Sequence, residues 1–428
     1  MKKVLVIAYY YPPLLDVGVQ RTLRYVKHMR KYNWDPHILT VKNPDRHYCI
    51  TGGVNAPYEY PVTRAYSLLN YSYFLGKFNG LIERIERCIP IIRLKHSLWE
   101  SLAIPDRVSG WLLTAYLHGV RLLMKNKFDL IYVSVQPFGS ALLAKWLSHM
   151  FNIPFVVDAR DPLTCIIYEG KEPETPRERF ACKHEVEIVK KCARFVLTTH
   201  TAKKLYKSHY SKYCHKFDAV YNGFDATEDQ QLPEFEPGKL NMIYVGNYYF
   251  DPSPILRVIK ELRSDDPIIG KNIIFRHIGL GGENISRIAA TMGIGDAVQI
   301  LNQKSRPEMM AYIRASDVFF VRTQFPTNIS AKMFDGLAVN MPILVTYAHD
   351  EIKALVESYA SKYTLLSDES TYQLKAAIKK HYLEDRDSGP KDMNCKFIQD
   401  FSGENLTRKM CLILDDAIRC SSHPIYTK

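Results

Sequence analysis

The chain has 428 residues, of which 46% are hydrophobic and 24% are charged. A length of this order usually holds two or three domains, and the apolar content is enough to give each a full core. No apolar run approaches the roughly 20 residues that a membrane-spanning helix needs. The formal net charge is +12, and residues 1–150 carry 20 Lys and Arg against 9 Asp and Glu. This basic first part could meet anionic lipid, nucleic acid or a phosphorylated substrate, and composition does not choose among them.

Cysteine usage indicates the compartment. The nine cysteines are scattered between Cys49 and Cys420 without a Cys-x-x-Cys pair. An odd, dispersed set in a large chain is typical of reduced thiols, so we expect a cytoplasmic protein. The spacing of Cys and His also matches no structural zinc site.

The N-terminal segment predicts a buried strand over residues 3–9. Its basic start and apolar run resemble a signal peptide, but the run is short, lacks a small-residue cleavage site and continues into Tyr-Tyr-Tyr-Pro-Pro. Helical spacing begins near Gln20, and a second strand follows, as in a βαβ unit. The intervening loop ends in Gly18, where the missing side chain either lets the backbone approach a ligand or only shapes a turn.

Residues 66–100 mix aromatic and aliphatic residues with cations. The cations are Lys77, Arg84, Arg87, Arg93 and Lys95. An apolar and cationic makeup is typical of a segment that lies in a membrane interface, so contact of this part of the first domain with a membrane is one interpretation. The alternative is a helical excursion packed on its own domain.

Residues 104–124 predict a helix. Its apolar spacing over Leu113, Leu117, Val120 and Met124 indicates that this side faces the core. Two later stretches, 169–190 and 203–217, are rich in charge and predict solvated helices. The tyrosines and cations of the second stretch would also suit single-stranded nucleic acid, but no recognition module surrounds them.

The stretch FVVDARDP places three charged side chains at the end of an apolar strand. They are Asp158, Arg160 and Asp161, and the carboxyl ends of parallel strands are where open α/β sheets bind ligands. Charges buried at such a place are usually paired, so an ion pair of Arg160 with Asp158 or Asp161 is the structural alternative.

The second half begins after a polar, Pro-containing linker over residues 226–240. Its first strand ends at Gly246 and Asn247, and Arg322 lies at the tip of a later strand. The Gly279-x-Gly281 pair suggests a dinucleotide loop only weakly, because the third glycine and the later acid are missing.

Residues 316–345 predict a strand, a loop, a short helix over 331–338 and a second strand over 343–346. Ser330 can cap the helix, and Asn340 can end it in a left-handed conformation. The exposed amides at its start attract anions, Lys332 adds a charge, and Asp335 lies one turn inward. A cation for phosphate and a carboxylate for sugar hydroxyls suggest a nucleotide-sugar pocket. The alternative is an ordinary amphipathic helix with a surface Lys and Asp.

These stretches, over roughly residues 3–420, resemble family 4 glycosyltransferases. In that family two glutamates eight positions apart contact the donor; the second falls on Asp335, and the first falls on Thr327, which is not acidic. The opening loop resembles the family's glycine loop, with Val17 in place of the first glycine and Gly18 as the second. The Asp-x-Arg-Asp-Pro stretch matches a subset of the family.

The resemblance implies the fold called GT-B, an α/β fold with two Rossmann-like parallel-sheet domains facing a central cleft. The expected parts are an acceptor domain (1–225), the linker (226–240), a donor domain (241–395) and a C-terminal helix crossing back to the first domain (396–428). The expected catalytic residues are Asp158, Arg160 and Asp161. The expected donor-binding residues are Gly18, Gly246, Asn247, Arg322, Thr327, Ser330, Lys332 and Asp335.

The resemblance also implies a retaining reaction by front-side attack, without a dedicated base. We expect no metal and no cofactor besides the nucleotide-diphosphate sugar. The one Asp-x-Asp match, at Asp385 and Asp387, lies in a polar stretch that predicts a solvated loop.

The predicted function is transfer of a sugar to a glycan or lipid-linked glycan in surface polysaccharide synthesis, at the inner face of the membrane. Three alternatives stay open: a nucleotide-sugar binder without transfer activity, a nucleotide-sugar epimerase, and a DNA-modifying glycosyltransferase that would use the basic face on phosphates.

Overall fold

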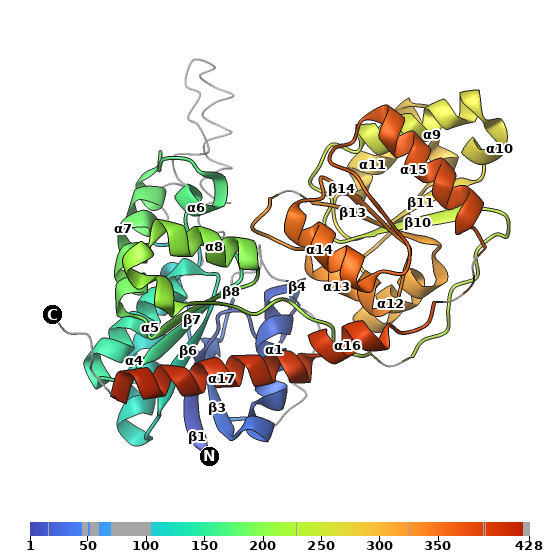
Figure 1. Ribbon diagram of the computed structural model, residues 1–428. Helices are drawn as coiled ribbons and strands as arrows, with labels where there is room; N and C mark the ends of the chain where they lie inside the picture. Colours follow the sequence, from blue (N-terminus) through green and yellow to red (C-terminus); the bar gives the residue numbers. More distant parts are fainter. Residues whose placement is uncertain are drawn as a thin grey trace. The chain divides into compact units, whose positions relative to one another are not determined.

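The computed structural model describes residues 1–15, 17–44, 50–51, 60–69, 104–227, 229–323, 325–387, 389 and 391–422. Most of the predicted membrane-facing segment, residues 70–100, lies outside them. The chain forms two compact units (Figure 1): unit 1 comprises Met1–Tyr221 and Gly403–Lys428, and unit 2 comprises Asn222–Ser402. Within the described residues, no helix combines the length and apolar character needed to cross a bilayer.

Unit 1 is built on a seven-stranded parallel sheet in the order β5-β3-β1-β6-β7-β8-β9. The strands are β1 (Lys2–Ile7), β3 (Trp34–Val41), β5 (Val62–Ala65), β6 (Leu130–Val135), β7 (Phe155–Ala159), β8 (Arg194–Leu197) and β9 (Phe217–Ala219). Two short strands, β2 (Leu14–Leu15) and β4 (Ile50–Thr51), pair separately. The order reverses direction between β1 and β6, which makes this point a topological switch.

Helices cover both faces of this sheet. The α-helices are α1 (Val17–Met29), α4 (Leu112–Lys125), α5 (Phe138–Phe151), α6 (Cys165–Glu169), α7 (Pro176–Lys191), α8 (His200–His209) and α17 (Gly403–Ser422). The short 3-10 helices are η1 (Arg30–Tyr32), η2 (Ser109–Trp111) and η3 (Ser211–Lys216). Successive residues of β1 enter different cores: Val4 and Val6 pack toward α1 and α17, whereas Leu5 and Ile7 pack toward α4 and α5. A strand buried on both faces needs such an uninterrupted apolar run.

The predicted inward face of α4 is wrong. Leu113, Leu117 and Met124 are exposed, and the helix instead buries Leu112, Ala115, Gly119 and Leu123. Gly119 decides the orientation, because a Cβ there would overlap the side chain of Leu147 on α5. The small residues of α4 thus let the two helices pack closely, and this close packing outweighs the burial of the larger residues.

The two charge-rich helices are also less solvated than the sequence predicts. Glu185 on α7 is buried, as is Tyr206 on α8, and Tyr210 just after α8 is nearly so. The hydroxyls of both tyrosines donate hydrogen bonds to the Glu185 carboxylate, at 2.6 and 2.8 Å. These hydrogen bonds are what allow a carboxylate to be buried here. The sequence did not reveal it, because one buried acid does not change the helical spacing of the surrounding residues.

Unit 2 contains a six-stranded parallel sheet in the order β12-β11-β10-β13-β14-β15. The strands are β10 (Leu240–Val245), β11 (Ile273–Ile278), β12 (Val298–Leu301), β13 (Val318–Arg322), β14 (Ile343–Thr346) and β15 (Tyr363–Leu365). The switch point of this sheet lies between β10 and β13.

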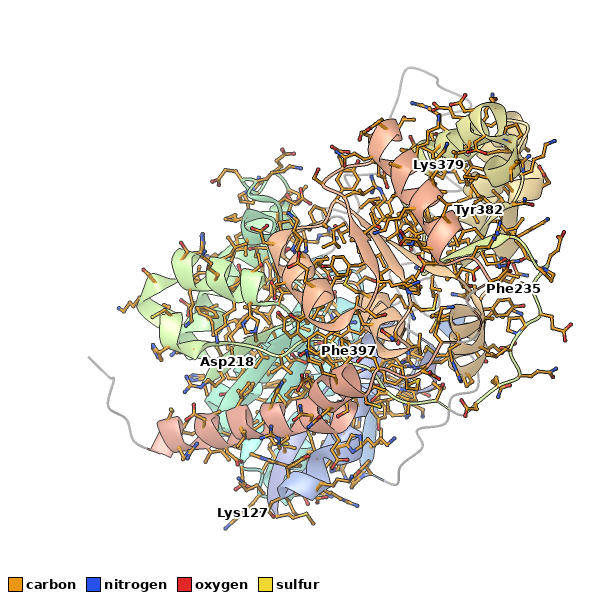
Figure 2. All side chains as sticks on the ribbon, turned by 45° about the vertical axis from the view of Figure 1, so that its right-hand side comes forward. Lys127, Asp218, Phe235, Lys379, Tyr382 and Phe397 are labelled. Atoms are coloured by element: carbon orange, nitrogen blue, oxygen red, sulfur yellow. The ribbon has the colours of Figure 1, made fainter. Side chains whose placement is uncertain are left out.

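The helices of unit 2 are α9 (Ser253–Asp265), α10 (Pro267–Gly270), α11 (Gly282–Thr291), η4 (Gly295–Ala297), α12 (Arg306–Ala315), α13 (Ala331–Ala338), α14 (Asp350–Tyr359), α15 (Thr371–Glu384) and α16 (Cys395–Phe401). Figure 2 labels Lys379 and Tyr382 on α15 and Phe397 on α16. Phe397 stacks on Phe401 with 4.6 Å between ring centroids, and both rings pack against Phe334 of α13. This aromatic cluster fixes α13 from its inner side.

The predicted secondary structure of residues 316–345 is confirmed. Helix α13 spans the predicted residues, and the Ser330 hydroxyl accepts a hydrogen bond from the Lys332 backbone N–H at 3.3 Å. Asn340 has φ of 49°, and β14 occupies the predicted residues.

The predicted solvated loop at Asp385 is wrong. Its carboxylate is buried at the end of α15, 2.6 Å from His381 Nδ1 and 2.6 Å from Lys362 Nζ. Asp387, by contrast, is exposed. The two acids therefore do not act as a pair, and the described residues contain no group of three or more Cys, His, Asp or Glu suited to a metal.

Candidate functional site

The switch point of unit 2 brings together five of the eight predicted donor-binding residues: Gly246, Asn247, Ser330, Lys332 and Asp335. Gly246 follows β10, and α13 follows β13, so the helix N-terminus opens at the carboxyl end of the sheet. The Lys332 side chain lies beside Gly246, with its Cγ 3.9 Å from where a Cβ at that glycine would stand. Burial lowers the pKa of Lys332, with the charge of Arg306 adding to the effect and that of Asp335 opposing it. The lysine is thus a partly desolvated cation at a helix N-terminus, a combination that favours an anionic ligand.

Asp335 has a partner that the sequence did not reveal. Its carboxylate accepts hydrogen bonds from Arg306, at 2.8 Å from Nη2 and 3.4 Å from Nη1, and Lys332 Nζ lies 4.0 Å away. Burial tends to lower the pKa of Arg306, but the charge and hydrogen bonds of Asp335, together with the charge of Asp225, raise it. The capping box of Ser305 and Glu308 places Arg306 at the first position of α12, and that motif is the one feature that could have pointed to it.

The backbone around Gly246 is held by further glycines and a histidine. Gly246 has φ of 121°, and its carbonyl oxygen lies 2.8 Å from Nε2 of His277. Burial lowers the pKa of His277, so the neutral ring donates this hydrogen bond. Gly279, with φ of 142°, lies so near that a Cβ would overlap the Gly246 carbonyl. The two glycines therefore let the ends of β10 and β11 approach each other closely. His277 is a residue that the sequence analysis did not identify.

Two other predicted donor residues have local partners. Asn247 donates from its amide to Tyr249 Oη at 2.9 Å and accepts from the Leu280 N–H at 3.3 Å. Arg322 donates from Nε to Glu369 at 3.0 Å, and its guanidinium lies 4.2 Å from the Phe250 ring centroid and 4.7 Å from that of Tyr347. Asn247 thus lies beside Gly246 and is held by hydrogen bonds to neighbouring residues. Arg322 is held instead by an ion pair with Glu369 and by two aromatic rings. Thr327, in the loop before α13, is buried.

Unit 1 contains a cavity of about 450 Å³ at its own switch point. Tyr10 follows β1, Gln136 follows β6 and Asp161 follows β7, and all three line it. The other lining residues are Pro105, Asp106, Arg107, Val108, Pro137, Phe138, Pro162, Leu163, Thr164, Glu169, Arg177, Glu178 and Ala181. A volume of this size suits a small ligand, and aromatic walls with charged and polar groups suit the apolar faces and hydroxyls of a sugar.

Asp161 lines this cavity, and Arg160 contacts two of its lining residues as well as Gly18. Arg160 donates to the Gln136 carbonyl at 3.1 Å and lies 5.1 Å from the Tyr10 ring centroid. A Cβ at Gly18 would overlap the Arg160 guanidinium, so the glycine is needed for this approach to the first turn of α1. Burial raises the pKa of Asp161, and Arg160 opposes the rise.

Asp158 lies elsewhere. It is fully buried in β7, where Arg21 donates to both of its oxygens at 2.8 Å and Tyr132 donates at 2.5 Å. Arg21 also donates to the backbone carbonyls of Val220 and Tyr221. The expected partner, Arg160, is not the one observed, and this geometry favours a structural role for Asp158 over a catalytic one.

Solved structures built from the same kind of parallel-sheet units decide the fold. A mutant of S. aureus TarM, in complex with Fondaparinux, alpha-GlcNAc-glycerol and UDP, matches with a TM-score of 0.62 at 9% identity, over 97% of this chain and 100% of that chain. Anabaena Alr3699/HepE, in complex with UDP and glucose, matches with a TM-score of 0.59 at 12% identity, over 97% and 100%. WaaG, a glycosyltransferase involved in lipopolysaccharide biosynthesis, matches with 0.57 at 13%, over 98% and 95%.

The chain has the GT-B fold. The predicted fold class is thereby confirmed as two parallel-sheet α/β units. No protein-family model and no curated protein sequence matches the chain. At these identities the similarity establishes the GT-B fold alone, so the activity has to be argued from the residues.

Ten of the eleven predicted site residues fall into three groups; the eleventh, Thr327, is buried in the loop before α13. Gly246, Asn247, Ser330, Lys332 and Asp335 lie together at the switch point of unit 2. Gly18, Arg160 and Asp161 lie together at or near the cavity of unit 1. Asp158 and Arg322 are each held by a buried partner outside those clusters.

Proposed function

We propose that the chain is a glycosyltransferase that moves a sugar from a nucleotide-diphosphate donor to a glycan or lipid-linked glycan acceptor. The observation that carries the proposal is the cluster of Lys332, Asp335 and the α13 N-terminus beside Gly246. It offers positive charge and amide dipoles for a diphosphate, and a carboxylate for the hydroxyls of a ribose or a sugar.

In the proposed reaction, this cluster stabilises negative charge on the leaving diphosphate. The acceptor hydroxyl oxygen bonds to the anomeric carbon while that carbon's bond to the diphosphate oxygen breaks, and the hydroxyl proton passes to the departing phosphate oxygen. Negative charge therefore grows on the diphosphate, and Lys332 with the helix dipole would stabilise it. We propose a metal-independent reaction that retains the anomeric configuration, in keeping with the resemblance to family 4.

Asp335 would accept a hydrogen bond from a nucleotide hydroxyl while it keeps its hydrogen bonds to Arg306. A carboxylate has about four acceptor positions, so the two guanidinium contacts leave room for a ligand hydroxyl. Arg306 is thus a positioning residue in the proposal, because its two hydrogen bonds fix the Asp335 rotamer.

The acceptor would bind in the unit 1 cavity, with Asp161 and Arg160 touching its hydroxyls. Four carboxylates and two guanidinium groups line the cavity, so it is rich in acceptors for sugar hydroxyls. Surface polysaccharide synthesis is the setting we propose, supported by the likeness to WaaG, which is involved in lipopolysaccharide biosynthesis, and by the glycan ligands in the TarM complex.

A silent nucleotide-sugar binder is the second candidate, favoured by Thr327 where the family has an acid. Incubation with UDP-glucose and other nucleotide-diphosphate sugars, a glycan acceptor and a chelator separates the candidates. The proposal expects a nucleotide diphosphate to be released only when acceptor is present, and Lys332→Met to lose at least about tenfold in rate. Release without a glycan product, conversion of the donor without acceptor, or full activity of Lys332→Met would contradict it.

A further inference from the structure

The outer faces of α4 and α5 form an exposed apolar surface on unit 1, which we call the α4–α5 face. It comprises Leu113 (61% exposed), Leu117 (59%) and Met124 (75%) on α4, and Trp146 (43%) and Met150 (57%) on α5. The three residues of α4 recur at helical spacing and so lie along one side of that helix. Single exposed apolar residues are ordinary, but five on two packed helices form a patch of the kind that marks an interaction surface.

The two helices make this face continuous. Leu147 of α5 packs against Gly119, where the absent side chain lets the helices approach. On the outer side, Tyr116 bridges them: its ring meets Trp146 edge-on at 6.4 Å between centroids, and its hydroxyl lies 3.3 Å from Sδ of Met150. The backbone N–H of Leu68 donates to the Gly110 carbonyl at 2.9 Å, so exposed Leu68 and Leu69 lie beside the start of α4.

The charges on this face have one sign. Residues 107–128 and 138–157, which include all of α4 and α5, contain no Asp or Glu. They contain four cations on or next to the two helices, Arg121, Lys125, Lys127 and Lys145, besides Arg107, which lines the cavity of unit 1. Arg121 shares the exposed side of α4 with the apolar residues, and Lys127, just past the helix, extends away from the ribbon (Figure 2). Three acids flank these stretches, and each has its own partner. Asp129 accepts a hydrogen bond from the Lys3 backbone N–H at 2.6 Å, Asp106 accepts from the backbone N–H groups of Val108 and Gly139, and Asp158 pairs with Arg21.

We propose that the α4–α5 face docks unit 1 onto the surface of an anionic lipid bilayer. Apolar side chains and an indole would enter the headgroup region, and the cations beside them would meet lipid phosphates. A second copy of this chain fits less well, because a symmetric contact would bring the same cations together with no carboxylate on either helix to compensate. The inference concerns residues other than the 66–100 segment and does not depend on the proposed activity.

The test is sedimentation of the full-length chain with two kinds of vesicle, phosphatidylcholine alone and phosphatidylcholine mixed with phosphatidylglycerol. We expect binding to the mixed vesicles only, weakened by salt. Arg121→Gln, Lys125→Gln and Lys145→Gln together should weaken it on the order of 100-fold, about fivefold for each cation. Leu117→Ser with Met150→Ser should also release the protein, because the apolar contribution is lost.

Matched variants of the same unit serve as controls. Lys190→Gln, Lys204→Gln and Lys207→Gln remove three exposed cations from α7 and α8, and Leu412→Ser removes a side chain that is 54% exposed on α17. These should bind as the unchanged chain does. Equal loss in the controls, no loss in the α4–α5 variants, or no binding of the unchanged chain would overturn the proposal. Sedimentation velocity without lipid adds a further readout: self-association that the Leu117→Ser, Met150→Ser variant abolishes would identify a second copy as the occupant and overturn it too.

Discussion

Arg21 and Asp158 form a bidentate ion pair with side chains 2% and 0% exposed. Breaking such a pair leaves an uncompensated buried charge, at a cost of about 3 to 5 kcal/mol. Asp158→Asn should therefore lower the free energy of unfolding by that order, measured by urea denaturation, while Asp129→Asn on the surface changes little. Loss of sugar transfer at an unchanged free energy of unfolding would instead return Asp158 to a catalytic role.

Asp161 differs from Asp158 because it lines the cavity, and burial raises its pKa above that of an ordinary aspartate. If the ionised carboxylate orients the acceptor, protonation removes that contact as the pH falls. The acidic limb of the pH profile of kcat/KM should then lie above the ordinary Asp value of about 3.9.

The matching variant is Asp161→Asn, which should lower kcat/KM and abolish this limb. Glu172→Gln, at an exposed acid that does not line the cavity, is the control that should keep the acidic limb. An unchanged limb in Asp161→Asn would show that another group titrates.

At the scale of elements, one wall of the cavity depends on α7 and α8. Glu185 of α7 accepts hydrogen bonds from Thr164 at 2.7 Å and from Tyr206 and Tyr210, and the Tyr206 hydroxyl in turn accepts from the Leu163 N–H at 2.9 Å. Burial raises the pKa of Glu185, although the three hydroxyl donors oppose the rise. Glu185 is thus a positioning residue for the cavity wall at Leu163 and Thr164.

Glu185→Gln should reveal this role, because an amide nitrogen cannot accept the hydrogen bonds that the replaced oxygen accepted. We expect a loss of about 1 to 3 kcal/mol in unfolding free energy. We also expect a higher KM for acceptor with the KM for donor unchanged, measured by initial rates below the melting transition. Glu187→Gln, on the same helix, should change neither the free energy of unfolding nor the KM for acceptor. Equal changes in the two KM values would indicate a purely structural role.

The sequence predicted elements well where each signal was local. Ser330, Asn340 and the apolar run of β13 fixed α13 and its flanking strand, because a cap, a left-handed end and a buried strand depend on neighbouring residues. It failed where tertiary packing decides. The outward face of α4 follows from the close approach of Leu147 to Gly119, and the pairs Arg21–Asp158 and Arg306–Asp335 join residues far apart in the chain.

At the scale of the whole chain, the two units carry different kinds of binding feature. Unit 1 has the cavity and the basic first 150 residues, with 20 cations against 9 acids. Unit 2 has the glycine-lined switch point, with Lys332 and Asp335 at the start of a helix. This division is the basis for placing acceptor on one unit and nucleotide on the other in the proposed function.

The central claim is that the α13 cluster binds a nucleotide-diphosphate sugar without metal, and ligand-induced protection from thermal unfolding tests it most directly. In chelator, at about 100 times Kd, the correct donor should add about 2.7 kcal/mol and raise the melting temperature by about 5 °C or more. Lys332→Met should lose this shift, whereas Lys260→Met, an exposed lysine of α9, should keep it. Absence of a shift for every donor, or an equal shift in Lys332→Met, would contradict the account.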